Sequence, residues 1–282
     1  MKPGGLRYRR PAGMSEALEF LAEPDAKVLA GGQSLVPLLN LRLAQPGTLV
    51  DINRLPGLDS IEVSPGEVRI GALVRHSGIE SATALVRALP ILSEIAAGLA
   101  YRAIRTRGTF CGSLAHADPL AEWPLVLCGL GGRVRAVSQR GEREIAVENF
   151  FQGFFATALE PDELLREAVL PLREGWVWGF SKFARKSGEF SLALALAGIE
   201  RAPDGTVQQA RVAVAGAGER PVRLPGLESA LRGRSRESLP VDSEIAGFLE
   251  GLEPAGDLHG SREYKLALAA TICRRALLRA WA

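Results

Sequence analysis

The chain has few of the residues that build metal centres and disulfide frameworks. Its 282 residues include three cysteines and three histidines, and both kinds are widely scattered. Cys111, Cys128 and Cys273 are odd in number and form no Cys-x-x-Cys pair. Such sites need closely spaced ligands or paired thiols, so this pattern argues against a metal site, an iron–sulfur cluster or a disulfide framework held by this chain alone. The apolar surroundings of Cys128 and Cys273 predict small core residues.

Charge of one sign and long apolar runs are equally scarce. Lys and Arg total 34 and Asp and Glu total 32, so the formal net charge is +2, with no long basic block and no acidic tail. This balance gives no electrostatic support to a nucleic-acid or membrane-surface role. No apolar run approaches the ~20 residues that span a bilayer. Residues 1–7 lack the apolar stretch of a secretory signal, so we expect a cytoplasmic protein.

The chain does have enough apolar residues, 47% of the total, to fill the cores of about two domains. Apolar periodicity and turn residues predict a mixture of helices and strands. In the first part we expect helices at 13–22 (with Ser15 as N-cap), 35–42, 78–89 and 90–99, and strands at 26–30, 48–52, 61–64, 68–72, 133–137, 144–147 and within 162–170. In the second part we expect an antiparallel meander of strands at 176–184, 192–199 and 207–215, then helices at 226–231, 243–249 and 261–280.

A glycine turn stands between the predicted strand at 26–30 and the predicted helix at 35–42. Gly31 and Gly32 allow positive φ and let a ligand approach the main chain closely. Backbone N–H groups at a helix start favour an anion, and Ser34 is the predicted N-cap. The turn therefore has the parts of a phosphate cradle. A capped strand–helix turn without a ligand fits the same residues, because short glycine motifs also occur by chance.

A second candidate lining for a binding site covers residues 104–124. This stretch is rich in small and turn-forming residues, and we expect a long functional loop. Gly108 and Gly112 permit close approach of the backbone, while Thr109 and Ser113 offer hydroxyl groups.

Several motifs together resemble a known family, the FAD-binding medium subunit of molybdenum hydroxylases of the carbon monoxide dehydrogenase and xanthine dehydrogenase type. The resemblance covers nearly the whole chain, and its strongest part is the stretch from Ile104 to Pro124. The other matching stretches are 29–35, 51–52, 70–72, 143–145, 149–151 and Thr157.

The resemblance implies an α+β fold. A FAD-binding domain at 1–172, of the vanillyl-alcohol oxidase or PCMH-like type, would contain two subdomains at about 1–57 and 58–172. A smaller C-terminal domain at 173–282 would follow, with an antiparallel sheet and helices. FAD would lie between the two subdomains, with the C-terminal domain closing over one side.

The resemblance also implies which residues contact FAD. The first stretch, through its backbone amides and Ser34, would bind the pyrophosphate, and the second would line the other side. Glu122 stands where an Asp commonly bonds the ribityl or ribose hydroxyls. The full set of implied cofactor-binding residues is Leu29, Ala30, Gly31, Gly32, Gln33, Ser34, Leu35, Leu99, Thr109, Cys111, Gly112, Ser113, His116, Glu122, Leu170, Phe180 and Lys182.

The remaining members of the set have more specific implied roles. Leu99 matches an apolar position near the isoalloxazine ring, and Leu170 an aliphatic position that offers a backbone contact. Lys182 matches a lysine beside the flavin, where its charge would tune the cofactor; a solvated strand lysine is the other interpretation. His116 is equally compatible with flavin proximity and with loop packing.

The sequence departs from the family pattern at four places. Cys111 replaces a glycine, and we expect its side chain to fill space that a glycine leaves open. Ser113 stands where Asn is common, Glu122 is one methylene longer than Asp, and Phe180 lacks the hydroxyl of a common Tyr. No cysteine-rich insert for an iron–sulfur cluster is present.

The resemblance implies an electron-transfer subunit without a catalytic acid, base or nucleophile of its own. Electrons would come from a molybdenum cofactor on a large subunit through [2Fe–2S] clusters on a small subunit. They would pass through FAD here to an external acceptor such as NAD, a quinone or oxygen, in a dimer of heterotrimers. Two alternatives remain open at this point: a stand-alone FAD-dependent oxidoreductase and a flavin-free assembly subunit.

Overall fold

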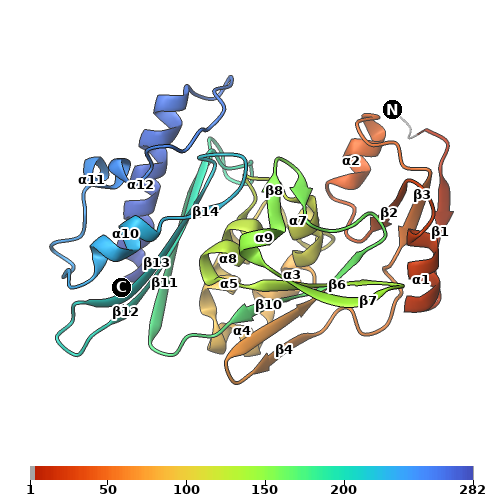
Figure 1. Cartoon of the computed structure of the whole chain (residues 1–282), viewed down its shortest axis with the longest axis horizontal. Helices are drawn as coiled ribbons and strands as arrows, with labels where there is room; N and C mark the ends of the chain where they lie inside the picture. The colour runs from red at the N-terminus through yellow and green to blue at the C-terminus, as the bar shows by residue number, and fades with distance from the viewer. Residues whose placement is uncertain (1–3, 282) are drawn as a thin grey trace.

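The computed structural model describes residues 4–281 and arranges their sheets in a row (Figure 1). A small N-terminal α/β unit lies at one end, a five-stranded sheet with helices lies in the middle, and a four-stranded sheet covered by helices lies at the other end. The predicted α+β class is therefore confirmed. No helix in the described part of the chain has the length and apolar character needed to cross a membrane.

The N-terminal unit is a three-stranded parallel sheet in the order β1-β3-β2. Its elements are β1 (Arg7–Arg9), α1 (Met14–Leu21), β2 (Ala26–Leu29), α2 (Leu35–Asn40) and β3 (Thr48–Asp51). Parallel neighbours need a crossover connection, and the glycine turn with α2 provides the one between β2 and β3. This arrangement puts the turn at the carboxyl end of β2.

The middle unit is built on an antiparallel sheet in the order β4-β5-β10-β6-β7. Its strands are β4 (Ile61–Ser64), β5 (Glu67–Gly71), β6 (Arg133–Ser138), β7 (Gly141–Ala146) and β10 (Leu164–Pro171). Its helices are α3 (His76–Ser81), α4 (Thr83–Ala88), α5 (Pro90–Ala97), α6 (Arg102–Arg105), α7 (Phe110–His116), α8 (Glu122–Leu130) and α9 (Val147–Phe150). A small hairpin of β8 (Phe151–Gly153) and β9 (Ala156–Thr157) completes it. Trp123, Phe110 and Phe150 are its largest fully buried side chains.

The C-terminal sheet is a meander in the order β11-β12-β13-β14, as predicted for its first three strands. Its elements are β11 (Trp176–Phe183), β12 (Ala193–Arg201), β13 (Val207–Ala215), β14 (Val222–Arg223), α10 (Pro225–Leu231), α11 (Asp242–Gly247) and α12 (Arg262–Ala280). The alternation of leucine and alanine in β12 assigns its two faces. Leu194 and Leu196 join the core of the middle unit, whereas Ala193, Ala195 and Ala197 face the core shared with α12.

Three sequence expectations differ from the structure. The predicted loop at 104–124 is largely helical, because Thr109 caps α7 and that helix buries Phe110, Cys111 and Leu114 against the sheet. The predicted helix at 78–89 is two helices, α3 and α4, separated by extended backbone at Ala82. The N-cap of α1 is Gly13, because the helix begins one residue before Ser15.

The close contact between β11 and α12 generates a stability prediction. A Cβ atom on Gly179 would lie 2.3 Å from the carbonyl oxygen of Ala276 and 2.4 Å from the backbone nitrogen of Ala280. Because both neighbours are helix backbone, Gly179→Ala must push α12 off the sheet and should lower the free energy of unfolding by about 3 kcal/mol. Denaturant unfolding measures this change.

The matched control is Gly247→Ala in α11, where an added Cβ meets no atom within 4 Å. Alanine is the better helix former, so this change should be neutral or stabilising by about 0.5–1 kcal/mol. Equal stability of the Gly179→Ala variant and the parent chain would contradict the described packing of α12.

Candidate functional site

The glycine turn after β2 contacts the middle unit main chain to main chain. A Cβ atom on Gly31 would lie 2.3 Å from the carbonyl oxygen of Arg107 and 2.7 Å from the Cα atom of Gly108. Gly32 has a φ of +70°, which side chains rarely adopt. The two stretches selected from the sequence as separate linings therefore meet at their glycines, and neither Gly31 nor Gly32 can carry a side chain without strain.

Four consecutive amides of this turn make no hydrogen bond to the described part of the chain. Among the described residues, no protein acceptor receives the backbone N–H of Gly31, Gly32, Gln33 or Ser34. The carbonyl of Gly32, by contrast, accepts the N–H of Val36 at 3.0 Å. Ser34 occupies the N-cap position but its hydroxyl makes no capping bond. Consecutive unpaired N–H groups beside a glycine with positive φ suit the oxygen atoms of a phosphate group.

Side chains behind the turn hold it in place. The Asn53 amide donates to the Ala30 carbonyl at 2.9 Å, and its side-chain oxygen accepts from Arg75 at 2.5 Å. Arg75 also donates to the carbonyl of Arg107. Asn53 and Arg75 thus connect the two glycine segments, and the sequence analysis missed both. The position of Asn53, directly after the Asp51-Ile52 motif, could have indicated its role from the sequence.

His76 lies on the other side of Gly108 and is nearly fully buried. Its Nδ1 accepts a hydrogen bond from Trp123 Nε1 at 3.0 Å, and a Cβ on Gly108 would come within 2.5 Å of its Nε2. Because an indole N–H only donates, the imidazole must be neutral with its proton on Nε2. Burial, and next the Arg75 and Arg105 charges, lower the pKa of His76 to about 4.

The start of α7 carries the next group of predicted site residues. The Thr109 hydroxyl accepts the N–H of Gly112 at 3.1 Å, which caps the helix. The Cys111 thiol points into the core and donates to the Ile70 carbonyl at 3.4 Å, and burial raises its pKa. The Cys111 side chain thus fills space inside the core, and the whole residue is only 2% exposed. Its place among the cofactor contacts stays a prediction. Ser113 is partly exposed.

Lys182 and Glu122 form an ion pair between the C-terminal sheet and α8. Lys182 Nζ lies 2.8 Å from Glu122 Oε1 and 2.7 Å from the carbonyl oxygen of Gly98, the residue before Leu99. The side chains are 21% and 12% exposed, so the solvated-lysine interpretation is wrong. Because the carboxylate neutralises the ammonium, this position presents a balanced pair rather than a free positive charge.

The other predicted site residues are more buried. Leu170 has no exposed surface and pairs with Val68 inside the sheet, so a ligand can reach it only if core residues move. Phe180 is 6% exposed and packs in the core of the middle unit. Leu99 is also buried, and His116 is half-buried.

The ring of His116 packs against that of Phe155, with 5.0 Å between their centroids. Burial lowers the pKa of His116, and the nearby Asp118 opposes this effect.

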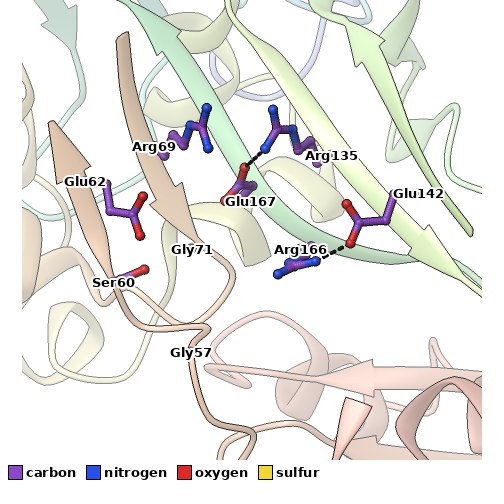
Figure 2. A pocket seen from close by; sticks show the side chains of 9 residues that line it. All are labelled: Gly57, Ser60, Glu62, Arg69, Gly71, Arg135, Glu142, Arg166 and Glu167. Atoms are coloured by element: carbon purple, nitrogen blue, oxygen red, sulfur yellow. Dashed lines mark hydrogen bonds and ion pairs between the residues drawn. The ribbon is translucent and has the colours of Figure 1, made fainter. Parts of the chain in front are cut away.

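A polar hollow on the open face of the five-stranded sheet is separate from these residues (Figure 2). Arg135 forms an ion pair with Glu167, and Arg166 forms one with Glu142. The positive and negative charges on neighbouring strands therefore neutralise one another. None of the predicted flavin residues lines it.

The structure thus combines an α/β unit and a five-stranded sheet, joined at the glycine turn, with a C-terminal domain built on the four-stranded sheet. Residues 4–173 match the family described as FAD binding domain in molybdopterin dehydrogenase, and residues 178–280 match the CO dehydrogenase flavoprotein C-terminal domain. The chain belongs to this family of FAD-binding medium subunits of molybdenum-dependent oxidoreductases. The resemblance inferred from the sequence is confirmed, as are FAD as its cofactor and its class as an oxidoreductase subunit.

Relatives and solved structures agree over the full length. The nicotine 6-hydroxylase medium subunit of Paenarthrobacter nicotinovorans is 36% identical, covering 100% of this chain and 99% of the relative. The carbon monoxide dehydrogenase medium chain of Hydrogenophaga pseudoflava is 34% identical, with the same coverage. A chain of quinoline 2-oxidoreductase from Pseudomonas putida 86 superposes with a TM-score of 0.92 at 37% identity, covering 100% and 98% of the two chains.

The buried neutral His76 generates a pH prediction. Its folded pKa of about 4 lies below the unfolded value of 6.5, so the unfolded chain binds an extra proton between these limits. This group therefore adds no pH dependence above pH 6.5, and it destabilises the fold progressively as pH falls towards 4. The total loss from this residue should be on the order of 3 kcal/mol.

Urea unfolding across this pH range for the parent chain and for His76→Gln tests the effect. Glutamine can still accept from Trp123 but does not titrate, so the variant should lose less stability on acidification. Parallel pH curves for the two proteins would show that His76 is not held neutral by its site.

Proposed function

We propose that this chain passes electrons from the [2Fe–2S] clusters of a small subunit, through FAD bound at the contact between its two glycine segments, to an external acceptor. The observation that carries the proposal is the row of unpaired amides at Gly31, Gly32, Gln33 and Ser34, which begins where Gly31 contacts the backbone of Gly108. A glycine-lined turn with four unused N–H donors suits a pyrophosphate, because it offers hydrogen bonds without side-chain obstruction.

The remaining cofactor contacts follow from this anchor. Leu29, Ala30 and Leu35 frame the pyrophosphate turn, and Thr109, Gly112 and Ser113 with the backbone of Cys111 form the second wall at the start of α7. Lys182 and Glu122 mark the flavin end, beside Leu99. This assignment is supported by the contact of Gly31 with Arg107 and Gly108, which directly precede Thr109, and by the ion pair that joins β11 to α8.

Bound FAD supplies the redox chemistry, and the side chains of this chain supply binding and electrostatics. The Glu122–Lys182 pair holds its charges close to the Gly98 carbonyl with little solvent access. The His76 side chain packs against Gly108 and is uncharged, because its pKa is about 4. It therefore is not a proton donor near neutral pH. We assign no catalytic acid, base or nucleophile to the chain.

The partners in this proposal are a small iron–sulfur subunit and a large subunit with the molybdenum cofactor, assembled as a dimer of heterotrimers. Support comes from relatives named as medium subunits or medium chains of hydroxylases and dehydrogenases. We place the complex in the cytoplasm, where reducing conditions suit the three free, buried cysteines. We place the boundary between the FAD-binding and C-terminal domains at residues 172–173, with the subdomain boundary near residue 57.

The central experiment compares FAD content in the parent chain and in Gly31→Ala. The added methyl group clashes with the Arg107 carbonyl and separates the two walls, so FAD affinity should fall at least about tenfold, which is about 1.4 kcal/mol. Visible absorbance of the purified protein and chromophore release on denaturation measure the bound flavin.

Gly78→Ala in α3 is the matched control, since an added Cβ there meets no atom within 4 Å and FAD content should not change. A folded Gly31→Ala variant with full FAD content would refute the site. If the isolated parent chain holds full FAD and also oxidises a substrate without partner subunits, a stand-alone oxidoreductase is favoured instead.

A second prediction uses the ion pair at the flavin end. Glu122→Gln leaves the Lys182 charge uncompensated and should raise the midpoint potential of the bound flavin, because reduction adds negative charge nearby. Lys182→Met leaves the carboxylate and should lower it. Shifts on the order of 30 mV, or about 1.4 kcal/mol for two electrons, are expected.

Reductive titration against a reference dye measures both shifts, and Lys186→Met on the exposed tip of the same hairpin serves as the charge control. Shifts of the same sign in Glu122→Gln and Lys182→Met would place the flavin away from this pair.

A further inference from the structure

A second, strongly basic pocket lies in the C-terminal domain, beside the segment that follows the FAD-binding domain. It has a volume of about 190 Å³ and lies between the segment that enters β11, the middle of β13 and the helix α10. Its charged lining consists of Arg173, Arg211, Arg223, Arg232 and Glu228. None of the proposed flavin contacts lines it.

The one carboxylate of this lining is already fully engaged. Glu228 accepts from Arg223 Nε at 3.1 Å and also from the backbone N–H of Val212 at 2.9 Å. It therefore neutralises Arg223 and satisfies a buried strand amide, leaving the other three arginines without a carboxylate in the pocket lining.

Two of those arginines have buried nitrogen atoms without a partner. Among the described residues, Arg211 Nη2 and Arg173 Nε are shielded from solvent and find no hydrogen-bond acceptor. An unsatisfied buried donor is costly, and more so when it is charged. Burial, and next the charges of Arg223 and Arg173, lower the pKa of Arg211 to about 10.

Both side chains are nevertheless held in position by other contacts. Arg211 donates through Nε to the carbonyl of Gly129 near the end of α8 at 2.7 Å. The guanidinium of Arg173 lies over the ring of Trp176, with 5.4 Å from Cζ to the ring centroid. The two guanidinium groups are thus preorganised, because neither can turn away without losing its anchor, although Arg211 Nη2 itself lies beside Gly131 and away from solvent.

We propose that this pocket binds a phosphate-type oxyanion between Arg173 and Arg211, with Arg232 at its mouth. Guanidinium groups that approach from different elements suit the several oxygens of a tetrahedral dianion. The excess of arginines also matches a dianion better than the single charge of a carboxylate. The ligand is either free inorganic phosphate or the phosphate group of a small metabolite.

The bound anion has a structural consequence. Arg173 lies in the segment between the two domains, and Arg211 already contacts α8 of the FAD-binding domain. A shared anion therefore ties the C-terminal sheet to the rest of the chain. The α8 helix begins at Glu122, so Arg211 and Lys182 contact the same helix.

Calorimetric titration of the flavin-loaded chain with inorganic phosphate, at constant ionic strength in chloride, tests the proposal. We expect saturable binding at one site and a phosphate-dependent rise in Tm. Arg211→Gln and Arg232→Gln should each weaken phosphate binding about tenfold or more, whereas Arg201→Gln, an exposed arginine of the same sheet outside the pocket, should leave it unchanged.

Glu228→Gln should change the phosphate affinity in the opposite direction. It keeps an oxygen for the Val212 amide but removes the competing negative charge, so phosphate should bind more tightly. A purely structural arginine cluster would not show such a gain. A metabolite source is distinguished by a phosphate monoester that binds more tightly than inorganic phosphate.

Three results would overturn the proposal: no saturable phosphate binding, equal binding of acetate, or binding unaffected by both Arg211→Gln and Arg232→Gln. FAD content, measured separately on each variant, keeps this outcome independent of the flavin assignment.

Discussion

The main-chain contact between Gly31 and the Arg107–Gly108 peptide is the constraint on which the site depends. It joins the parallel N-terminal unit to the antiparallel middle unit so closely that a Cβ atom at position 31 would overlap the backbone of the middle unit. Around it, Asn53 and Arg75 connect the two segments by hydrogen bonds, and His76 packs against the far side of Gly108. The unpaired amides lie at this junction because the backbone there is used for contact between subdomains rather than for secondary structure.

The C-terminal domain closes the other side through a simple sequence pattern. Alternating leucine and alanine in β12 give the sheet a bulky face towards α8 and a flat face towards α12. Gly129 of α8 leaves room for Leu196, and Gly179 leaves room for α12. Two polar contacts, Lys182 with Glu122 and Arg211 with the Gly129 carbonyl, then fix the sheet along the length of α8.

Local patterns predicted much of this fold. The strand–turn–helix at 26–42, the hairpin at 61–72 and the meander at 176–215 depend on short-range periodicity and turn residues, and the structure contains all three. The helix α7 was missed because its small residues resemble a loop, and its stability comes from burial of Phe110 and Leu114 against distant strands.

Hydrogen–deuterium exchange of the purified chain, with and without FAD, shows whether the cofactor binds at the glycine turn. We expect FAD to slow exchange of the amides at 31–34, which have no protein acceptor in the described chain, while the open face of the five-stranded sheet stays unchanged. Protection of that sheet face around Arg135 and Glu167, with no change at 31–34, would contradict this expectation.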